Sequence, residues 1–149
     1  MRVFRGFSRP VSGPTALAIG NFDGVHRGHL ALLERLVVAA RAADLPATIL
    51  TFEPHPREFF APESAPARLT TLREKLELLA DAGVEQVMVC RFNAAFAGLS
   101  AAQFIDTVLV TGLRMRHLII GDMFRFGKVR SGDFSMLQSA GLQSNFTVE

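Results

Sequence analysis

The sequence predicts an α/β fold, a doubly wound parallel sheet with helices on both faces. Two observations support this prediction: short, continuously apolar runs alternate with segments of helical periodicity, and the runs are rich in Ile, Val and Leu. Such runs are typical of parallel strands covered on both faces, and their alternation with helices produces right-handed crossovers. The predicted strands are Ala16–Ile19, Ala47–Phe52, Gln86–Arg91 and His117–Ile120, and Phe146–Glu149 is interpreted as the start of another.

The segments between these strands have the apolar spacing of amphipathic helices. The first helix carries apolar residues at helical spacing over Leu30–Ala40 and ends near Pro46. The second begins at a capping box, Thr71–Glu74, and ends before a glycine. The third extends over Ser100–Gly112, and a fourth, short helix is predicted to begin around Ser131–Asp133.

Composition indicates one globular domain. The chain has 149 residues, of which 49% are hydrophobic and 20% charged. The net charge is only +2 and there is no run of Lys or Arg, so we expect no nucleic-acid partner. The single cysteine, Cys90, lies in an apolar run and is expected to be a buried thiol. No segment has the character of a signal peptide or of a membrane span, so we expect a cytoplasmic protein without membrane contact.

Each unusual segment of the chain directly follows a predicted strand. Gly20–His29 follows the first strand, Glu53–Arg57 the second and Gly121–Gly127 the fourth. In open α/β sheets, ligands bind beyond the carboxyl ends of the strands. We therefore expect these segments to gather at one edge of the sheet and to face one cleft.

One long stretch, Pro54–Ala67, is predicted to be irregular because it contains four prolines. Loops of this length inside compact domains are more often functional than idle. Within it, the neighbours Arg57 and Glu58 are expected to form a surface ion pair.

The segment Gly20–His29 is the candidate site for phosphate chemistry. Its glycine spacing matches neither dinucleotide-binding nor Walker motifs, but Gly24 and Gly28 allow a ligand to approach the backbone, and a helix N-terminus attracts phosphate. His26 and His29 lie three positions apart, which places both imidazoles on one side of the first helical turn. Two converging donors suit nucleotidyl or phosphoryl transfer, and loss of one would cost roughly 2–4 kcal/mol of barrier. The alternative is that they only cap the helix or bind a stray metal ion; because no Cys or third His lies nearby in sequence, no metal site is expected.

The segment Gly20–His29 resembles the H-x-G-H signature of class I nucleotidyltransferases. It is most similar to the bacterial bifunctional riboflavin kinase/FAD synthetases, in their N-terminal FMN adenylyltransferase module. The resemblance covers essentially the whole chain and implies a Rossmann-like sheet of the nucleotidyltransferase type. Its further matching segments are Thr51–Pro56, Leu69–Lys75, Phe92–Phe104 and Gly121–Gly127.

The resemblance implies the reaction of ATP and FMN to FAD and pyrophosphate, with Mg²⁺ on the ATP phosphates. His26 and His29 would stabilise the transition state at the α-phosphate. The residues implied on the ATP side are Gly20, Asn21, Phe22, Asp23 and Gly28.

Four residues are expected to frame the flavin. By resemblance, Pro54 and Pro56 match a proline loop, while Phe60 and Phe126 match aromatic positions near the isoalloxazine ring. The chemistry agrees, because prolines form rigid walls and phenylalanines form stacking faces for a flat, amphipathic ring. The alternatives are a stiff surface turn for the prolines and ordinary core for the phenylalanines.

The chain departs from the family pattern in two places. Met123 stands where the family usually has a polar Asp or Asn, and a downstream Ser/Thr-rich motif ending in Ile-Arg is absent. We therefore expect residues 1–149 to be an adenylyltransferase domain truncated at its C-terminus, with the riboflavin kinase domain found only in the full family protein. One alternative is a module of this fold that binds flavin or adenine nucleotide without turnover. Another, a transferase acting on pantetheine phosphate or nicotinate mononucleotide, is disfavoured by the proline loop and the aromatic residues.

Overall fold

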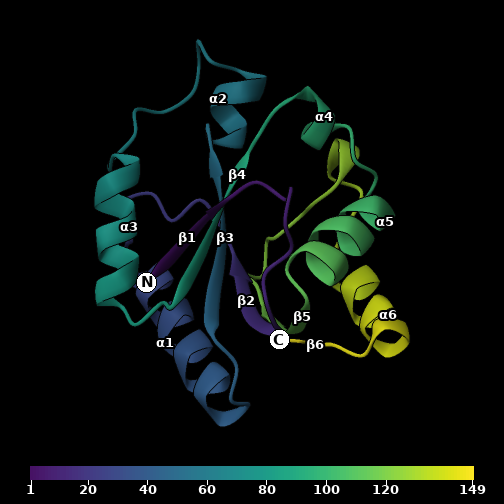
Figure 1. Ribbon diagram of the computed structural model, residues 1–149. Coiled ribbons are helices and arrows are strands. Elements are labelled where there is room, and N and C mark those ends of the chain that lie inside the picture. Colours follow the sequence, from purple (N-terminus) through teal and green to yellow (C-terminus); the bar gives the residue numbers. More distant parts are fainter.

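A computed structural model describes residues 1–149 and contains one six-stranded, entirely parallel sheet (Figure 1). The strand order is β1-β4-β3-β2-β5-β6. All the predicted strands are confirmed, but β1 was not predicted. The strands are β1 (Arg2–Arg5), β2 (Thr15–Ile19), β3 (Ala47–Glu53), β4 (Gln86–Arg91), β5 (Met115–Ile119) and β6 (Thr147–Val148).

The predicted helices are present, and their starts are fixed by side-chain caps. Thr71 accepts a hydrogen bond from the Glu74 amide, and Asp133 accepts one from the Met136 amide. The stretch Pro54–Ala67, predicted to be irregular, contains the short helix α2. The helices are α1 (Arg27–Ala42), α2 (Pro56–Phe60), α3 (Leu72–Asp81), α4 (Ala94–Ala97), α5 (Ala101–Gln103), the π-helix η1 (Phe104–Gly112), the 3₁₀ turn η2 (Lys128–Arg130) and α6 (Phe134–Ser144).

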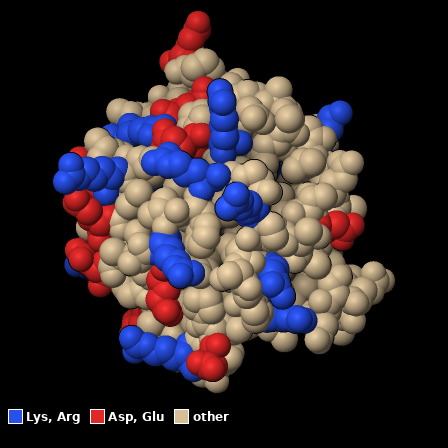
Figure 2. All heavy atoms as spheres, viewed as in Figure 1, with Lys and Arg blue, Asp and Glu red and all other residues tan.

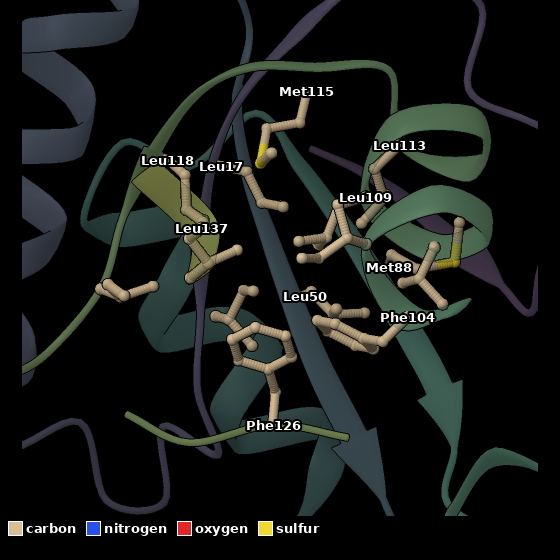
Figure 3. Packing of buried hydrophobic residues seen from close by; sticks show 14 of the residues in the cluster. Leu17, Leu50, Met88, Phe104, Leu109, Leu113, Met115, Leu118, Phe126 and Leu137 are labelled. Carbon is tan, nitrogen blue, oxygen red and sulfur yellow. The ribbon is translucent and has the colours of Figure 1, made fainter. Parts of the chain in front are cut away.

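Helices cover both faces of the sheet, as predicted, and each face has its own core (Figure 1). On one face, Leu33 of α1 and Leu79 of α3 pack against β2, β3 and β4. On the other face, η1 and α6 pack against the same strands (Figure 3). Burial of one such leucine contributes about 1.5–3 kcal/mol, so the two cores fix the layers. None of the helices combines the length and the apolar composition of a membrane-spanning segment.

The carboxyl ends of the strands meet at one edge of the sheet, as expected for parallel neighbours. In Figure 1 this edge points towards α2 and α4, which follow β3 and β4. The loops after β2 and β5 begin at the same edge, because β2 pairs with both β3 and β5. The expectation that the unusual segments gather at one edge is therefore confirmed.

Candidate functional site

The two predicted histidines stack on each other at the start of α1. Their ring centroids are 3.7 Å apart and the ring planes differ by 16°. The Nδ1 atom of His26 accepts hydrogen bonds from the amides of Gly28, at 3.1 Å, and of His29, at 3.3 Å. Because Nδ1 is the acceptor, neutral His26 carries its proton on Nε2 and presents an N–H donor from an exposed ring. His26 thus both caps the helix and offers a donor to a ligand.

His29 is the more enclosed of the two rings. Burial, and secondarily the neighbouring His26, lowers the pKa of His29 to about 4. The Nδ1 atom of His29 is buried without a hydrogen-bond partner. The centroids of the His29 and Phe22 rings are 5.0 Å apart. At neutral pH His29 is therefore uncharged and can act on a ligand only through its other ring nitrogen, Nε2.

The loop that carries the histidines is anchored to the segment that precedes α3. The Asp23 carboxylate accepts hydrogen bonds from the amides of Leu69 and Thr70 and from the Thr70 hydroxyl, each at about 2.9 Å. The Gly24 amide donates to the same hydroxyl, at 3.2 Å. Burial raises the pKa of Asp23, but these hydrogen bonds outweigh it and hold the pKa below its usual value. The Asp23 carboxylate is thus engaged in holding the loop.

The side chains predicted on the ATP side differ in whether they are exposed or engaged within the protein. The Phe22 side chain is buried in the core beside His29, and its contact with ATP stays a prediction. Asn21 is exposed, whereas the Asp23 carboxylate is turned to residues 69 and 70. A Cβ atom on Gly20 would lie 3.1 Å from the Phe22 ring, and one on Gly28 would lie 3.1 Å from the His26 ring. A side chain at either position would therefore crowd a ring of the loop itself, and the contact of both glycines with ATP stays a prediction.

A buried lysine, not predicted as a site residue, lies behind this loop. Lys75 of α3 is only 1% exposed, and its Nζ donates to the Asn21 carbonyl at 2.9 Å and to Thr51 Oγ1 at 3.2 Å. Burial lowers the pKa of Lys75, and the nearby Glu53 opposes that shift. Lys75 lies within the matching segment Leu69–Lys75, but nothing in its local sequence shows that it is buried.

Arg68 holds the segment Glu53–Glu58, which contains Pro54 and Pro56 and is called the proline segment below. Arg68 donates to both oxygens of Glu58, at 2.9–3.0 Å from Nε, and to Glu53, at 3.0 Å from Nη1. The expected pair of Arg57 with Glu58 is therefore wrong, because the fold brings Arg68 to that carboxylate. The hydrogen bonds from Arg68 lower the pKa of Glu58 to about 2. The end of β3, helix α2 and the segment before α3 are thus joined by one side chain.

The flavin-side residues are only partly brought together. Pro54 directly follows β3 and Pro56 is the first residue of α2, whereas Phe60 at the end of α2 is 67% exposed. The Phe60 ring packs edge-to-face on Phe92, which directly follows β4, with centroids 5.6 Å apart. Phe92 was not predicted, although its position after a strand end was a usable signal.

Phe126 does not join this group. It is only 6% exposed and packs against Phe104, with centroids 5.3 Å apart, inside the core (Figure 3). Its expected contact with the flavin stays a prediction, and the ring presents little surface to a ligand. Met123, in the same segment, is 86% exposed.

Two hollows lie beside β1, and neither is lined by the histidines. One, of about 350 Å³, lies between the ends of β1, β3 and β4 and includes Arg5 and Arg91; the other, of about 510 Å³, lies between β1 and α3. Figure 2 shows Lys and Arg side chains interspersed with acidic ones over this face.

Comparison with known proteins agrees with the sequence-based resemblance. The chain is 49% identical over 151 residues to the bifunctional riboflavin kinase/FMN adenylyltransferase of Escherichia coli K12, and 48% identical to that of Pseudomonas fluorescens. These alignments cover 99% and 100% of this chain but 48% of each relative, so the chain spans about half the length of the curated relatives it matches.

Solved structures support the fold. A Streptococcus pneumoniae protein described as a macrolide-efflux protein matches all of this chain and 50% of its own, with a TM-score of 0.78 and 23% identity. The pantothenate synthetase of Thermus thermophilus matches with a TM-score of 0.57 and 19% identity, over 100% of this chain and 60% of its own. At such identities the likeness concerns the fold alone, and it agrees with the predicted α/β architecture of a parallel sheet covered by helices.

The family itself follows from the sequence match over almost the full chain. The model of the family described as FAD synthetase matches residues 8–149. This range includes Gly20–His29, called the histidine loop below, together with the proline segment and residues 68–75, which contact both. The chain therefore belongs to the FAD synthetase family.

Proposed function

We propose that this domain transfers the adenylyl group of ATP to the phosphate of FMN, giving FAD and pyrophosphate. The observation that carries the proposal is the stacked pair His26 and His29 at the carboxyl edge of the sheet, in front of a helix N-terminus. An oxygen of the FMN phosphate attacks the α-phosphorus of ATP, and the bond from that phosphorus to the bridging oxygen of the β-phosphate breaks. The reaction requires no redox change, and negative charge spreads over the α-phosphate oxygens in the transition state.

The two imidazoles supply the stabilisation of that charge. His26 presents its Nε2 proton because its Nδ1 is engaged by backbone amides. His29 is neutral at pH 7 and is held against Phe22, so its ring orientation is fixed. Donors fixed before the reaction need no reorganisation when charge develops, which is the main source of catalysis in such sites.

The flavin side of the proposed site is aromatic. Pro54 and Pro56 provide rigid walls, and the exposed Phe60 with its neighbours Phe59 and Phe92 provides ring faces and edges. We propose that Mg²⁺ enters on the ATP phosphates, since no three His, Cys, Asp or Glu side chains cluster in this domain. The riboflavin kinase activity in the names of the relatives belongs to those proteins; for this one, a kinase domain and a cytoplasmic location are further proposals.

The test is FAD formation from ATP and FMN by the full-length protein and its His26→Ala and His29→Ala variants. Each variant is expected to be about 10²-fold slower, the usual effect of removing one such donor. His117→Ala is the matched control, because this histidine lies in β5 and contacts Thr147 and Glu149 instead. Turnover that is unchanged in either site variant would refute the assigned role.

A second candidate function is binding without turnover, and Met123 favours it. A largely exposed methionine neither donates a strong hydrogen bond nor binds a hydrated ion, so this loop offers less to phosphate than a polar residue would. Calorimetric titration of ATP and FMN beside the FAD assay separates the two candidates. Binding of both ligands without FAD formation would select this one, and Met123→Asp would then be expected to restore activity.

A further inference from the structure

Lys75 is a buried charge that the proposed chemistry does not use directly. The ammonium is enclosed between α3 and the sheet, and only its two neutral partners, Asn21 O and Thr51 Oγ1, are within hydrogen-bonding distance. Moving an ammonium group from water into the protein interior costs on the order of several kcal/mol. Replacing buried charged side chains by apolar ones of similar volume often leaves the stability of a protein unchanged or raises it. A stabilising role therefore does not explain a lysine at this position.

The partners of Lys75 lie in or next to the two segments of the proposed site. Asn21 begins the loop that carries His26 and His29, and Thr51 lies in β3 just before the proline segment. The Thr51 hydroxyl also donates to the Asn21 carbonyl, at 3.2 Å. One carbonyl thus receives two donors, one from β3 and one from α3, and its position is fixed with respect to both elements.

The loop remains folded without this contact. Its middle is held by Asp23 on residues 69 and 70, and the Phe22 ring is buried in the core. Loss of the Lys75 ammonium therefore leaves the Asn21 carbonyl with the Thr51 hydroxyl as its remaining side-chain donor, while these other anchors persist. A change at Lys75 should affect the placement of the imidazoles more than the stability of the domain.

We propose that Lys75 is a positioning residue for adenylyl transfer. Through the Asn21 carbonyl and the Thr51 hydroxyl it sets the histidine loop in a fixed place relative to the proline segment. This proposal rests on the proposed function. It does not require Lys75 to contact either substrate.

The experiment compares Lys75→Met, Thr51→Val and Thr51→Ser in the full-length protein. Lys75→Met is expected to lower kcat about 10²-fold with KM changed less than about 3-fold, because misplacing a catalytic group by about 1 Å has effects of that size. Thr51→Val is expected to lower kcat about tenfold, as for loss of one hydrogen bond to a charged group, and Thr51→Ser should restore it. The double variant Lys75→Met/Thr51→Val should be no slower than Lys75→Met alone, since both changes act on one carbonyl.

The control is Arg73→Met, which removes a cation from an exposed position of the same helix. All assays are made well below the melting temperature of each variant. A lowered melting temperature with an unchanged kcat of the folded Lys75→Met protein would mean a merely structural role and would overturn the proposal. Additive losses in the double variant would overturn it as well.

A second measurement separates this proposal from the proposed function. The imidazole NMR resonances of His26 and His29 are expected to shift in Lys75→Met and not in Arg73→Met. If the wild-type protein forms no FAD, the proposed function fails, yet these resonances still test the position of the loop. Resonances unchanged in Lys75→Met would overturn the proposal whatever the activity.

Discussion

Arg68 should carry a measurable part of the stability of this domain, although its neighbourhood is a surface loop. It donates five hydrogen bonds, three to Glu58 and two to Glu53. The three side chains are 26–30% exposed, so water screens them only in part. Arg68→Met removes these bonds and leaves two carboxylates facing each other at the end of β3.

The magnitude follows from this intermediate exposure. Exposed ion pairs are worth about 0.2–1 kcal/mol each, and breaking a buried pair costs about 3–5 kcal/mol, so we expect a loss of about 2 kcal/mol. For a domain of this size, that loss corresponds to a fall in melting temperature of about 4–8 °C. Arg73→Met is the control, because its partner Glu77 is an exposed residue one helical turn away; its effect should be below about 0.5 kcal/mol.

The same contact predicts how stability depends on pH. The Arg68 hydrogen bonds lower the folded-state pKa of Glu58 to about 2, from an ordinary value of 4.5. Their contribution is therefore complete above pH 4.5 and is lost as the pH falls from 4.5 towards 2. Thermal unfolding monitored by circular dichroism should show a gap between wild type and Arg68→Met at pH 7 that narrows below pH 4.5. Equal melting temperatures at pH 7, or a gap that stays constant at acidic pH, would refute the reasoning.

Three further predictions concern single residues. Gly24→Ala should cost about 1–2 kcal/mol in denaturant unfolding because Gly24 has φ +74° and a Cβ there would lie 2.8 Å from Leu69, whereas Gly13→Ala, with open space around it, should be nearly neutral. The His29 imidazole should titrate near pH 4 when followed by NMR, and titration near pH 6.5 would contradict its burial. Because a histidine in the unfolded chain accepts a proton near pH 6.5, the contribution of neutral His29 to stability should be lost as the pH falls from 6.5 to 4. Burial raises the pKa of Cys90 to about 12, so a disulfide reagent at pH 8 should modify it only after unfolding, and rapid labelling of the native protein would contradict this.

The sheet could be predicted because its central strands are buried on both faces and are therefore continuously apolar. β1 escaped prediction for the opposite reason: it is an edge strand with arginines at both ends and mostly exposed side chains. Helix starts were predictable where one side chain caps its own turn, as Thr71 and Ser100 do. The π-helical turns of Phe104–Gly112 were not, since an apolar stripe indicates a helix without specifying its hydrogen-bonding pattern.

Site features that depend on neighbouring residues could be predicted from the sequence, whereas those that depend on contacts distant in sequence could not. The stacked histidines were predictable, because a spacing of three residues fixes their relation within one helical turn. Phe60 and Phe126 both follow strands in sequence, yet one is 67% exposed and the other 6%, and only the fold decides which. The pairing of Glu58 likewise depends on Arg68, ten residues away, and displaces the neighbour Arg57 that the sequence suggested.

The contacts that shape the proposed site converge on the segment 68–75. Arg68 holds the end of β3 and α2, the amides of Leu69 and Thr70 hold Asp23, and Lys75 holds the Asn21 carbonyl. These residues determine where the histidine loop and the proline segment stand relative to each other. This arrangement gives a physical reason for the resemblance to the family in Leu69–Lys75. In-line transfer between two bound nucleotides depends on the distance between the loops that bind them, so substitutions in this segment should alter kcat without removing any contact to a substrate.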